Sequence, residues 1–226
     1  MFKDHLKVSY NKQQHDDISL NFQISKNLLL ENFKVNKGVF KPDGIAAQRF
    51  AQFLSENPTF YKDKNVLDLG CGTGLQGIIM AICGSSQVTF ADISPKAVIN
   101  TLENIKGYNL ESKSIILESN LFSEINTKYD LIIFNHPYFD EPASKDDSIL
   151  SSITDSGDLL RKFLKEAREY LVDSGEIIMP YLPIAGEINN PSLRGKEYGY
   201  NVEVLFSDYL EKSDGDKLLF DIYKLC

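Results

Sequence analysis

The stretch VLDLGCGTG, residues 66–74, decides the fold. An apolar strand that contains Asp68 runs directly into three glycines at alternate positions, so the backbone can turn tightly and approach a ligand closely. In parallel sheets, ligands bind at the carboxyl edge, where such loops lie. The spacing differs from the dinucleotide-binding motif GxGxxG, because the third glycine would fall at position 75, which is Leu75.

Downstream of this stretch, short apolar segments alternate with segments of helical period. Strands are predicted at 65–70, 87–92, 114–119, 129–135, 175–182, 200–206 and 217–225, and helices at 75–84, 94–110 and 158–171. A right-handed crossover needs a helix between parallel neighbours, so this alternation predicts an α/β fold with a doubly wound, mostly parallel sheet. The irregular segments 141–157 and 185–200 are expected to be loops over the site.

Upstream of it, the chain has a different pattern. Apolar and polar residues alternate over 18–24 and again over 6–10, which predicts an amino-terminal antiparallel hairpin made of these two segments. The segment GVFKPDG (38–44) marks a turn, and a helix is expected from residue 45 until Pro58 stops it. We therefore predict a hairpin and lid segment over 1–44 and a catalytic domain over 45–226.

Composition restricts which binding partners and which cellular compartment we expect. The 226 residues carry a net charge of -8, so no overall positive field is available to hold a nucleic-acid backbone. The three cysteines form neither a disulfide framework nor a CxxC metal motif, and the histidines lack metal-ligand spacing, so we expect a reducing compartment and no metal. Since no apolar run approaches the ~18 residues of a membrane span, the sequence predicts a cytoplasmic protein.

A second acidic residue extends the candidate ligand site. Asp92 ends the predicted strand QVTFAD, twenty residues after Gly72. A carboxylate at that strand end can accept hydrogen bonds from both hydroxyls of a ribose, while the glycine loop beside it can receive a tail the size of an amino acid. Together they suit a nucleoside without phosphates.

The two motifs VLDLGCGTG and ADISPKAV (91–98) resemble the first two binding motifs of class I S-adenosylmethionine (SAM)-dependent methyltransferases. The resemblance implies a Rossmann-like, seven-stranded sheet whose last strand is antiparallel, with SAM as the cofactor across its carboxyl edge. The family normally has an acid at the third binding position, where this chain has Asn120. The implied cofactor contacts are Asp68, Gly70, Cys71, Gly72, Gly74, Asp92, Ile93, Asn120 and Leu121.

A third motif, NHPY (135–138), ends the predicted fourth strand of the sheet and resembles the NPPY signature of methyltransferases that act on planar nitrogens. The resemblance implies that the side-chain oxygen of Asn135 and the main-chain carbonyl of His136 accept the two nitrogen-bound hydrogens. Pro137 would fix the turn, and Tyr138 would offer a face for stacking. His136 replaces the usual proline, and we expect it to contact substrate or to pack, because a positioned nitrogen needs no strong base before methyl transfer.

Within that family, the amino-terminal region is similar to the small-domain methyltransferases, which include release-factor glutamine and ribosomal RNA guanine enzymes. Phe40 and Phe139 are the predicted substrate contacts. Three functions are consistent with the sequence. The first is N-methylation of an amide or amine of a protein or small molecule, which the acidic charge favours. The second is methylation of an RNA base, for which Lys34, Lys37 and Lys41 could form a local basic patch. The third is a non-catalytic SAM-binding or scaffold protein.

Overall fold

A computed structural model describes residues 10–11, 13, 15–144, 147–211, 215 and 217–226. One large sheet contains seven strands: β3 (Asn65–Leu69), β4 (Gln87–Asp92), β5 (Ser114–Glu118), β6 (Tyr129–Phe134), β7 (Leu171–Tyr181), β8 (Val202–Glu211) and β9 (Lys217–Leu225). Their order is β5-β4-β3-β6-β7-β9-β8. The strands from β5 to β7 are parallel neighbours, and β9 is antiparallel to both β7 and β8. The predicted Rossmann-like sheet with an antiparallel last strand is confirmed.

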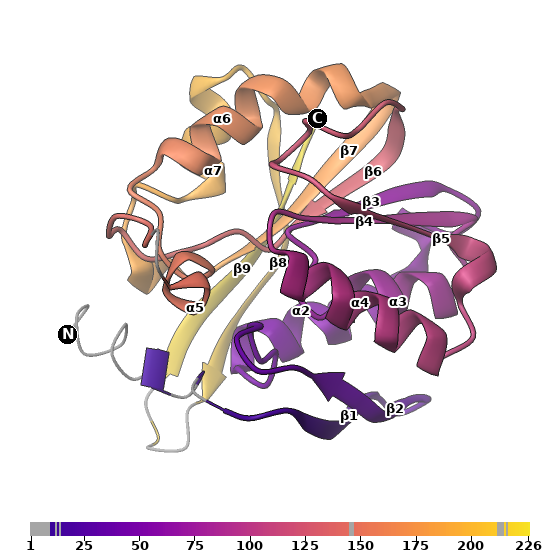
Figure 1. Ribbon diagram of the computed structural model, residues 1–226. Coiled ribbons are helices and arrows are strands. Elements are labelled where there is room, and N and C mark those ends of the chain that lie inside the picture. The colour runs from indigo at the N-terminus through magenta and orange to yellow at the C-terminus, as the bar shows by residue number, and fades with distance from the viewer. Residues whose placement is uncertain (1–9, 12, 14, 145–146, 212–214, 216) are drawn as a thin grey trace.

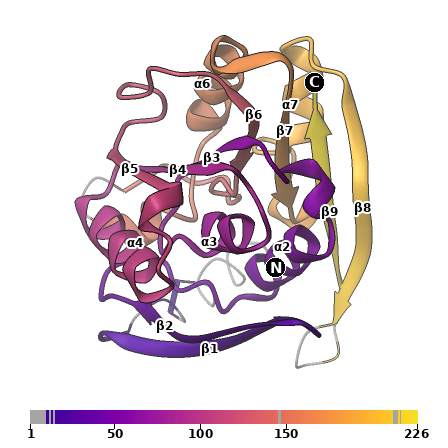
Figure 2. The ribbon, with the colours of Figure 1, turned by 90° about the vertical axis from the view of Figure 1, so that its right-hand side faces the viewer.

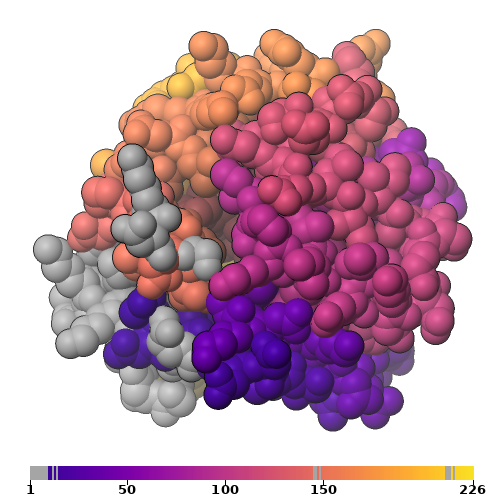
Figure 3. Space-filling view, viewed as in Figure 1, coloured from indigo at the N-terminus to yellow at the C-terminus, as the bar shows by residue number. Residues whose placement is uncertain are grey.

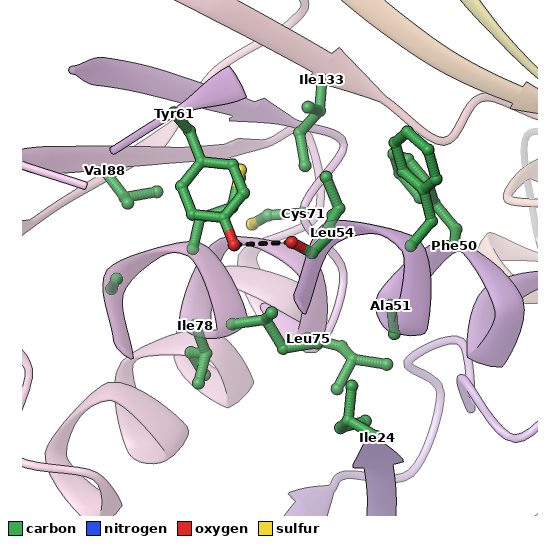
Figure 4. Close-up of a cluster of buried hydrophobic side chains, with 14 of the residues drawn as sticks. Ile24, Phe50, Ala51, Leu54, Tyr61, Cys71, Leu75, Ile78, Val88 and Ile133 are labelled. Atoms are coloured by element: carbon green, nitrogen blue, oxygen red, sulfur yellow. Dashed lines mark hydrogen bonds between the residues drawn. The ribbon is translucent and has the colours of Figure 1, made fainter. Parts of the chain in front are cut away.

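Helices cover both faces of this sheet (Figure 1). One face packs against α2 (Ile45–Glu56), α3 (Leu75–Ile82) and α4 (Pro95–Gly107), and the other against α6 (Asp158–Glu166) and α7 (Pro191–Glu197). Successive strand residues point to opposite faces, so Val66 lies in one buried cluster and Leu67 in the other. Figure 4 shows the first cluster, in which the hydroxyl of the buried Tyr61 donates to the Leu54 carbonyl at 2.7 Å.

The amino-terminal hairpin differs from the predicted one. Strand β1 (Ile18–Ser25) pairs antiparallel with β2 (Leu28–Val35). Of segment 6–10, which was predicted to be its partner, Tyr10 is helical, and residues 6–9 lie outside the described residues. The pattern of β2 is hard to recognise because a bulge near Asn32, whose φ is 56°, shifts the register and breaks the alternation of buried side chains.

This hairpin forms an additional layer outside α2, α3 and α4, as the two perpendicular views show (Figures 1 and 2). Its buried residues Phe22, Leu30 and Phe33 belong to the same hydrophobic cluster as Phe50 of α2. The rings of Phe22 and Phe33 meet edge to face, with centroids 5.5 Å apart. The hairpin therefore packs on the core through its apolar side chains, and the division of the chain at residue 44 stays a prediction.

Several predicted boundaries are also corrected. Segment 185–200, expected to be a loop, contains α7, which begins after Asn190 because that side chain accepts hydrogen bonds from two main-chain N–H groups of the first turn. Segment 141–157 contains the short helix α5 (Ser148–Ser151). Strand β7 begins at Leu171, four residues earlier than expected. Single turns of 3₁₀ helix occur at Pro58–Phe60, Glu111–Lys113, Ala167–Tyr170 and Pro183–Ala185. In the part of the chain described here, no helix combines the length and the apolar character needed to cross a membrane.

Candidate active site

The predicted site residues gather at one edge of the sheet. Strands β3, β4, β5 and β6 are parallel, so the segments that follow them meet at their common carboxyl edge. The glycine loop, Asp92, Asn120 and the NHPY motif follow these four strands in turn. In the space-filling view the surface is hollowed between the magenta residues after β4 and β5 and the orange segments after β6 (Figure 3).

The glycine loop leaves β3 with a backbone that only glycine adopts readily. Gly70, Gly72 and Gly74 have φ values of 64°, 58° and 83°. A side chain on Gly70 would place its Cβ only 3.2 Å from the ring of Phe134, whereas at Gly72 a Cβ would meet nothing within 4 Å. The backbone at Gly72 thus opens onto free space.

Two of the implied cofactor residues are buried and support this loop. Asp68 is 3 % exposed, and its Oδ2 accepts the main-chain N–H of Gly77 at 2.9 Å. Burial, with the negative charge of Asp92 nearby, raises the pKa of Asp68 to about 7. Cys71 is also buried, and its Sγ lies 3.5 Å from the Thr101 hydroxyl. Burial raises the pKa of the Cys71 thiol well above its usual value, so the neutral thiol packs against α4.

Asp92 ends β4 and faces the loop. Its two oxygens accept the main-chain N–H groups of Gly72 and Ser94, each at 2.9 Å. A carboxylate has about four acceptor positions, so capacity remains for the hydroxyls of a ribose. Burial raises the pKa of Asp92, and these backbone N–H groups oppose the shift. The neighbouring Ile93 is 63 % exposed and offers apolar surface beside the acid.

The segment after β5 carries the third predicted cofactor position. Asn120 is exposed, and its main-chain N–H donates to the Ser123 hydroxyl at 3.1 Å. Leu121 is buried and has a φ of 53°, an unusual value for a residue with a Cβ. The Ser119 hydroxyl donates to the Leu121 carbonyl at 2.8 Å and holds this conformation. The Asn120 side chain is therefore exposed to solvent on a turn whose backbone is held by hydrogen bonds.

The NHPY motif follows β6. Asn135 is half-buried, and its Oδ1 accepts the Tyr138 hydroxyl at 2.6 Å. Pro137 between them is buried. The Tyr138 ring meets the Tyr181 ring edge to face, with centroids 5.3 Å apart. Asn135, the predicted acceptor for a substrate nitrogen, is thus satisfied by a hydroxyl from the same motif.

The ring of His136 turns into the interior. It is 3 % exposed and stacks on Tyr181 at a centroid distance of 5.9 Å. Its Nε2 donates to the Asn189 carbonyl at 2.8 Å, since a carbonyl can only accept. Burial lowers the pKa of His136 to about 4, so the imidazole is neutral at pH 7. The ring is therefore packed in the interior, and a contact of His136 with substrate stays a prediction.

Asn189 and Asp155, which the sequence analysis did not identify, hold this motif in place. The buried Asn189 donates through Nδ2 to the carbonyls of Tyr138, at 3.3 Å, and Asp155, at 2.5 Å. The main chain of Phe139 pairs with the same segment, because the Asp155 N–H donates to the Phe139 carbonyl at 2.9 Å. The sequence signal was the pair Asn189-Asn190 before a proline, which predicts a helix cap but not which side chain turns inward.

The two predicted substrate contacts, Phe139 and Phe40, pack against a hydrophobic cluster. The Phe139 side chain is 8 % exposed, within the cluster that contains Phe134, and Phe40 is partly buried against the same cluster. A contact with substrate stays a prediction for both.

A separate cavity of about 330 Å³ lies between β1, α2 and β8 and includes none of the predicted site residues. Its lining includes Arg49, Gln52, Asp208 and Tyr209.

Comparison with known proteins identifies the family of this chain. The family model described as "Methyltransferase small domain" matches residues 31–181. The "Putative protein N5-glutamine methyltransferase" of Methanocaldococcus jannaschii is 34 % identical over 158 residues, which cover 67 % of this chain and 78 % of that protein. The "Release factor glutamine methyltransferase" of Borreliella burgdorferi is 28 % identical over 190 residues, 79 % of this chain and 61 % of that one.

The fold also matches solved structures. The T. thermophilus 16S rRNA N2 G1207 methyltransferase, solved with SAM and guanosine, superposes with a TM-score of 0.63 at 19 % identity, over 91 % of this chain and 49 % of that one. The family model and the relatives show that the chain is a SAM-dependent methyltransferase. The chain belongs to the methyltransferase small-domain family. It spans less than two thirds of the Borreliella and T. thermophilus proteins, so their substrates do not carry over directly.

Proposed function

We propose that this methyltransferase acts on a side-chain amide nitrogen of a protein. The observation that carries the proposal is the position of Asn135, which directly follows β6 at the carboxyl edge of the sheet; β6 pairs with β3, the strand that leads into the glycine loop. Planar amide nitrogens are poor nucleophiles, so their hydrogens must be held by well-placed acceptors. Oδ1 of Asn135 and the main-chain carbonyl of His136 are the acceptors that we assign to this role.

The cofactor contacts complete the proposed site. Bound SAM supplies an electrophilic methyl group. We assign the glycine loop to its amino-acid tail, Asp92 to its ribose and the exposed amide of Asn120 to its adenine. In the structure the Tyr138 hydroxyl occupies Oδ1 of Asn135, and a substrate N–H would replace this hydroxyl at the same acceptor. The neutral, buried His136 ring contributes the position of the motif and takes up no proton from the substrate.

The charges of the described surface favour a protein substrate over RNA. Each lysine of the candidate basic patch forms an ion pair with a carboxylate. The distances are 3.8 Å from Lys34 to Glu103, 2.9 Å from Lys37 to Asp16 and 2.9 Å from Lys41 to Asp43. With a net charge of -8, these lysines offer little free positive charge to phosphates. The glutamine methyltransferases among the relatives support the same substrate class, whereas the rRNA enzyme among the similar structures supports RNA as the second candidate.

Methyl transfer from radiolabelled SAM tests the proposal directly. A purified bacterial release factor and protein-free ribosomal RNA serve as the two acceptors. We expect label in the protein, and we expect Asn135→Ala to lower turnover by on the order of a hundredfold, since it removes one acceptor that acts in the transition state. Calorimetry should find the SAM affinity of this variant unchanged. Labelling of the RNA alone, or full activity of Asn135→Ala, would contradict the assignment.

A further inference from the structure

Helix α4 carries three buried polar side chains for which methyl transfer has no evident use. Asn100, Thr101 and Asn104 are between 0 % and 2 % exposed. They face two segments at once. Thr101 and Asn104 contact the glycine loop, while Asn100 and Asn104 contact the outer edge of strand β2. The hairpin and the candidate cofactor loop are therefore joined through one face of this helix, below the sheet in Figure 2.

Asn104 is the residue that touches both segments. Its Oδ1 accepts the main-chain N–H of Lys34 at 2.8 Å. Its Nδ2 donates to the Lys34 carbonyl at 2.9 Å and to the Thr73 carbonyl at 3.0 Å. Both amide hydrogens are thus used, and the Lys34 N–H fixes which end of the amide is the oxygen, because an N–H can only donate.

Asn100 lies one helical turn earlier and offers a natural comparison. Its Nδ2 donates to the Lys34 carbonyl at 2.9 Å, and its Oδ1 accepts the Asn36 N–H at 2.8 Å. The two asparagines have the same side chain, the same helix face and the same hairpin partner. They differ in two contacts: Asn104 accepts the Lys34 N–H where Asn100 accepts the Asn36 N–H, and of the two side chains Asn104 is the one that donates to the Thr73 carbonyl.

We propose that Asn104 is a positioning residue for the cofactor loop. The hairpin orients its amide, and the amide in turn holds the Thr73 carbonyl, which lies between the two glycines 72 and 74 of the loop. A loop that is held before binding loses less conformational freedom when SAM arrives, so the hairpin strengthens cofactor binding through its own backbone. This inference rests on the proposed assignment of the glycine loop to SAM.

Paired substitutions separate this role from plain stability. Asn104→Asp keeps an acceptor for the Lys34 N–H but loses the donor to the Lys34 and Thr73 carbonyls, whereas Asn100→Asp loses a donor to the Lys34 carbonyl alone. Titration calorimetry should show SAM binding weakened about tenfold in Asn104→Asp, the value of a net hydrogen bond of about 1.4 kcal/mol. Asn100→Asp should bind SAM within about twofold of the wild type, because the buried apolar residues keep the hairpin docked. Both variants should melt at a lower temperature.

Wild-type affinity in Asn104→Asp, or equal weakening in both variants, would overturn the proposal. If Asn104→Asp does not fold, the uncharged Asn104→Ser replaces it, and amide hydrogen exchange over residues 70–76 is measured without SAM. We expect faster exchange in Asn104→Ser than in Asn100→Ser, and equal exchange would reject the role. A wild-type protein that binds SAM with no protection of 70–76 would instead contradict the assignment of the loop to SAM.

Discussion

At the scale of single residues, burial favours the neutral form of two titratable side chains around the site. It raises the pKa of Asp68 to about 7 and lowers the pKa of His136 to about 4. The cause is the same in both cases, since a charged group loses its hydration when it enters the protein. At pH 7 the NHPY motif therefore holds a neutral imidazole, and Asp68 is close to half ionised.

Asp68 makes the stability of the fold depend on pH. Its folded-state pKa of about 7 lies above the ordinary value of 3.8, so the stability it contributes is full below pH ~4 and is lost as the pH rises through 7. Asp68→Asn should remove this loss. In urea unfolding at pH 5 and pH 8, we expect the variant to lose less free energy of unfolding than the wild type, by roughly 2–4 kcal/mol. Parallel pH profiles for the two proteins would contradict this prediction.

Residue types at this site were predictable where a local pattern determines them. The positive φ values of Gly70, Gly72 and Gly74 and the strand-end position of Asp92 follow from motifs of a few residues. The contacts of Asn104 and Asn189 did not follow, because each joins segments distant in the sequence, such as Asn104 with Lys34. No local pattern specifies the partner of a buried side-chain amide.

At the scale of elements, regular alternation and helical period predicted the strands of the large sheet, and irregularity hid β2 and α7. Strand β2 contains a bulge, so its buried residues do not alternate. Helix α7 has only seven residues, too few for a period to be recognised. The sequence predicted that 141–157 and 185–200 lie over the site, but it could not show which of their residues make the contacts, such as Asn189 with Tyr138 and Asp155 with Phe139.

The start of α6 provides a prediction at this scale. The buried Asp155 accepts main-chain N–H groups from Asp158 at 3.1 Å and from Leu159 and Leu160 at 3.2 Å each. Asp155→Ala leaves these donors without a partner and should lower the free energy of unfolding by about 1–3 kcal/mol. Asp155→Asn keeps one oxygen and should lose less. A thermal melt of Asp155→Ala at the wild-type temperature would show that water satisfies these groups equally well.

At the scale of the whole molecule, the hairpin, helices α2, α3 and α4, and one face of the large sheet share one hydrophobic cluster. We expect the hairpin to unfold together with the rest of the chain. Phe33 is fully buried, so Phe33→Ala should cost about 3–5 kcal/mol in urea unfolding and preserve a single transition. Leu29→Ala is the matched control, because Leu29 lies on the same strand and is 48 % exposed; its effect should stay within about 0.5 kcal/mol. A separate early transition in Phe33→Ala would show that the hairpin is an independent unit.

The position of β9 between β7 and β8 sets an order of events during translation. A ribosome synthesises β8 before β9, yet β8 joins the sheet only through β9. Until residues 217–225 have emerged, the nascent chain carries β7 as an open edge and β8 as a strand with no place in the sheet. Unpaired edges recruit other chains, so a released chain that ends near residue 211 would expose both β7 and β8 to aggregation.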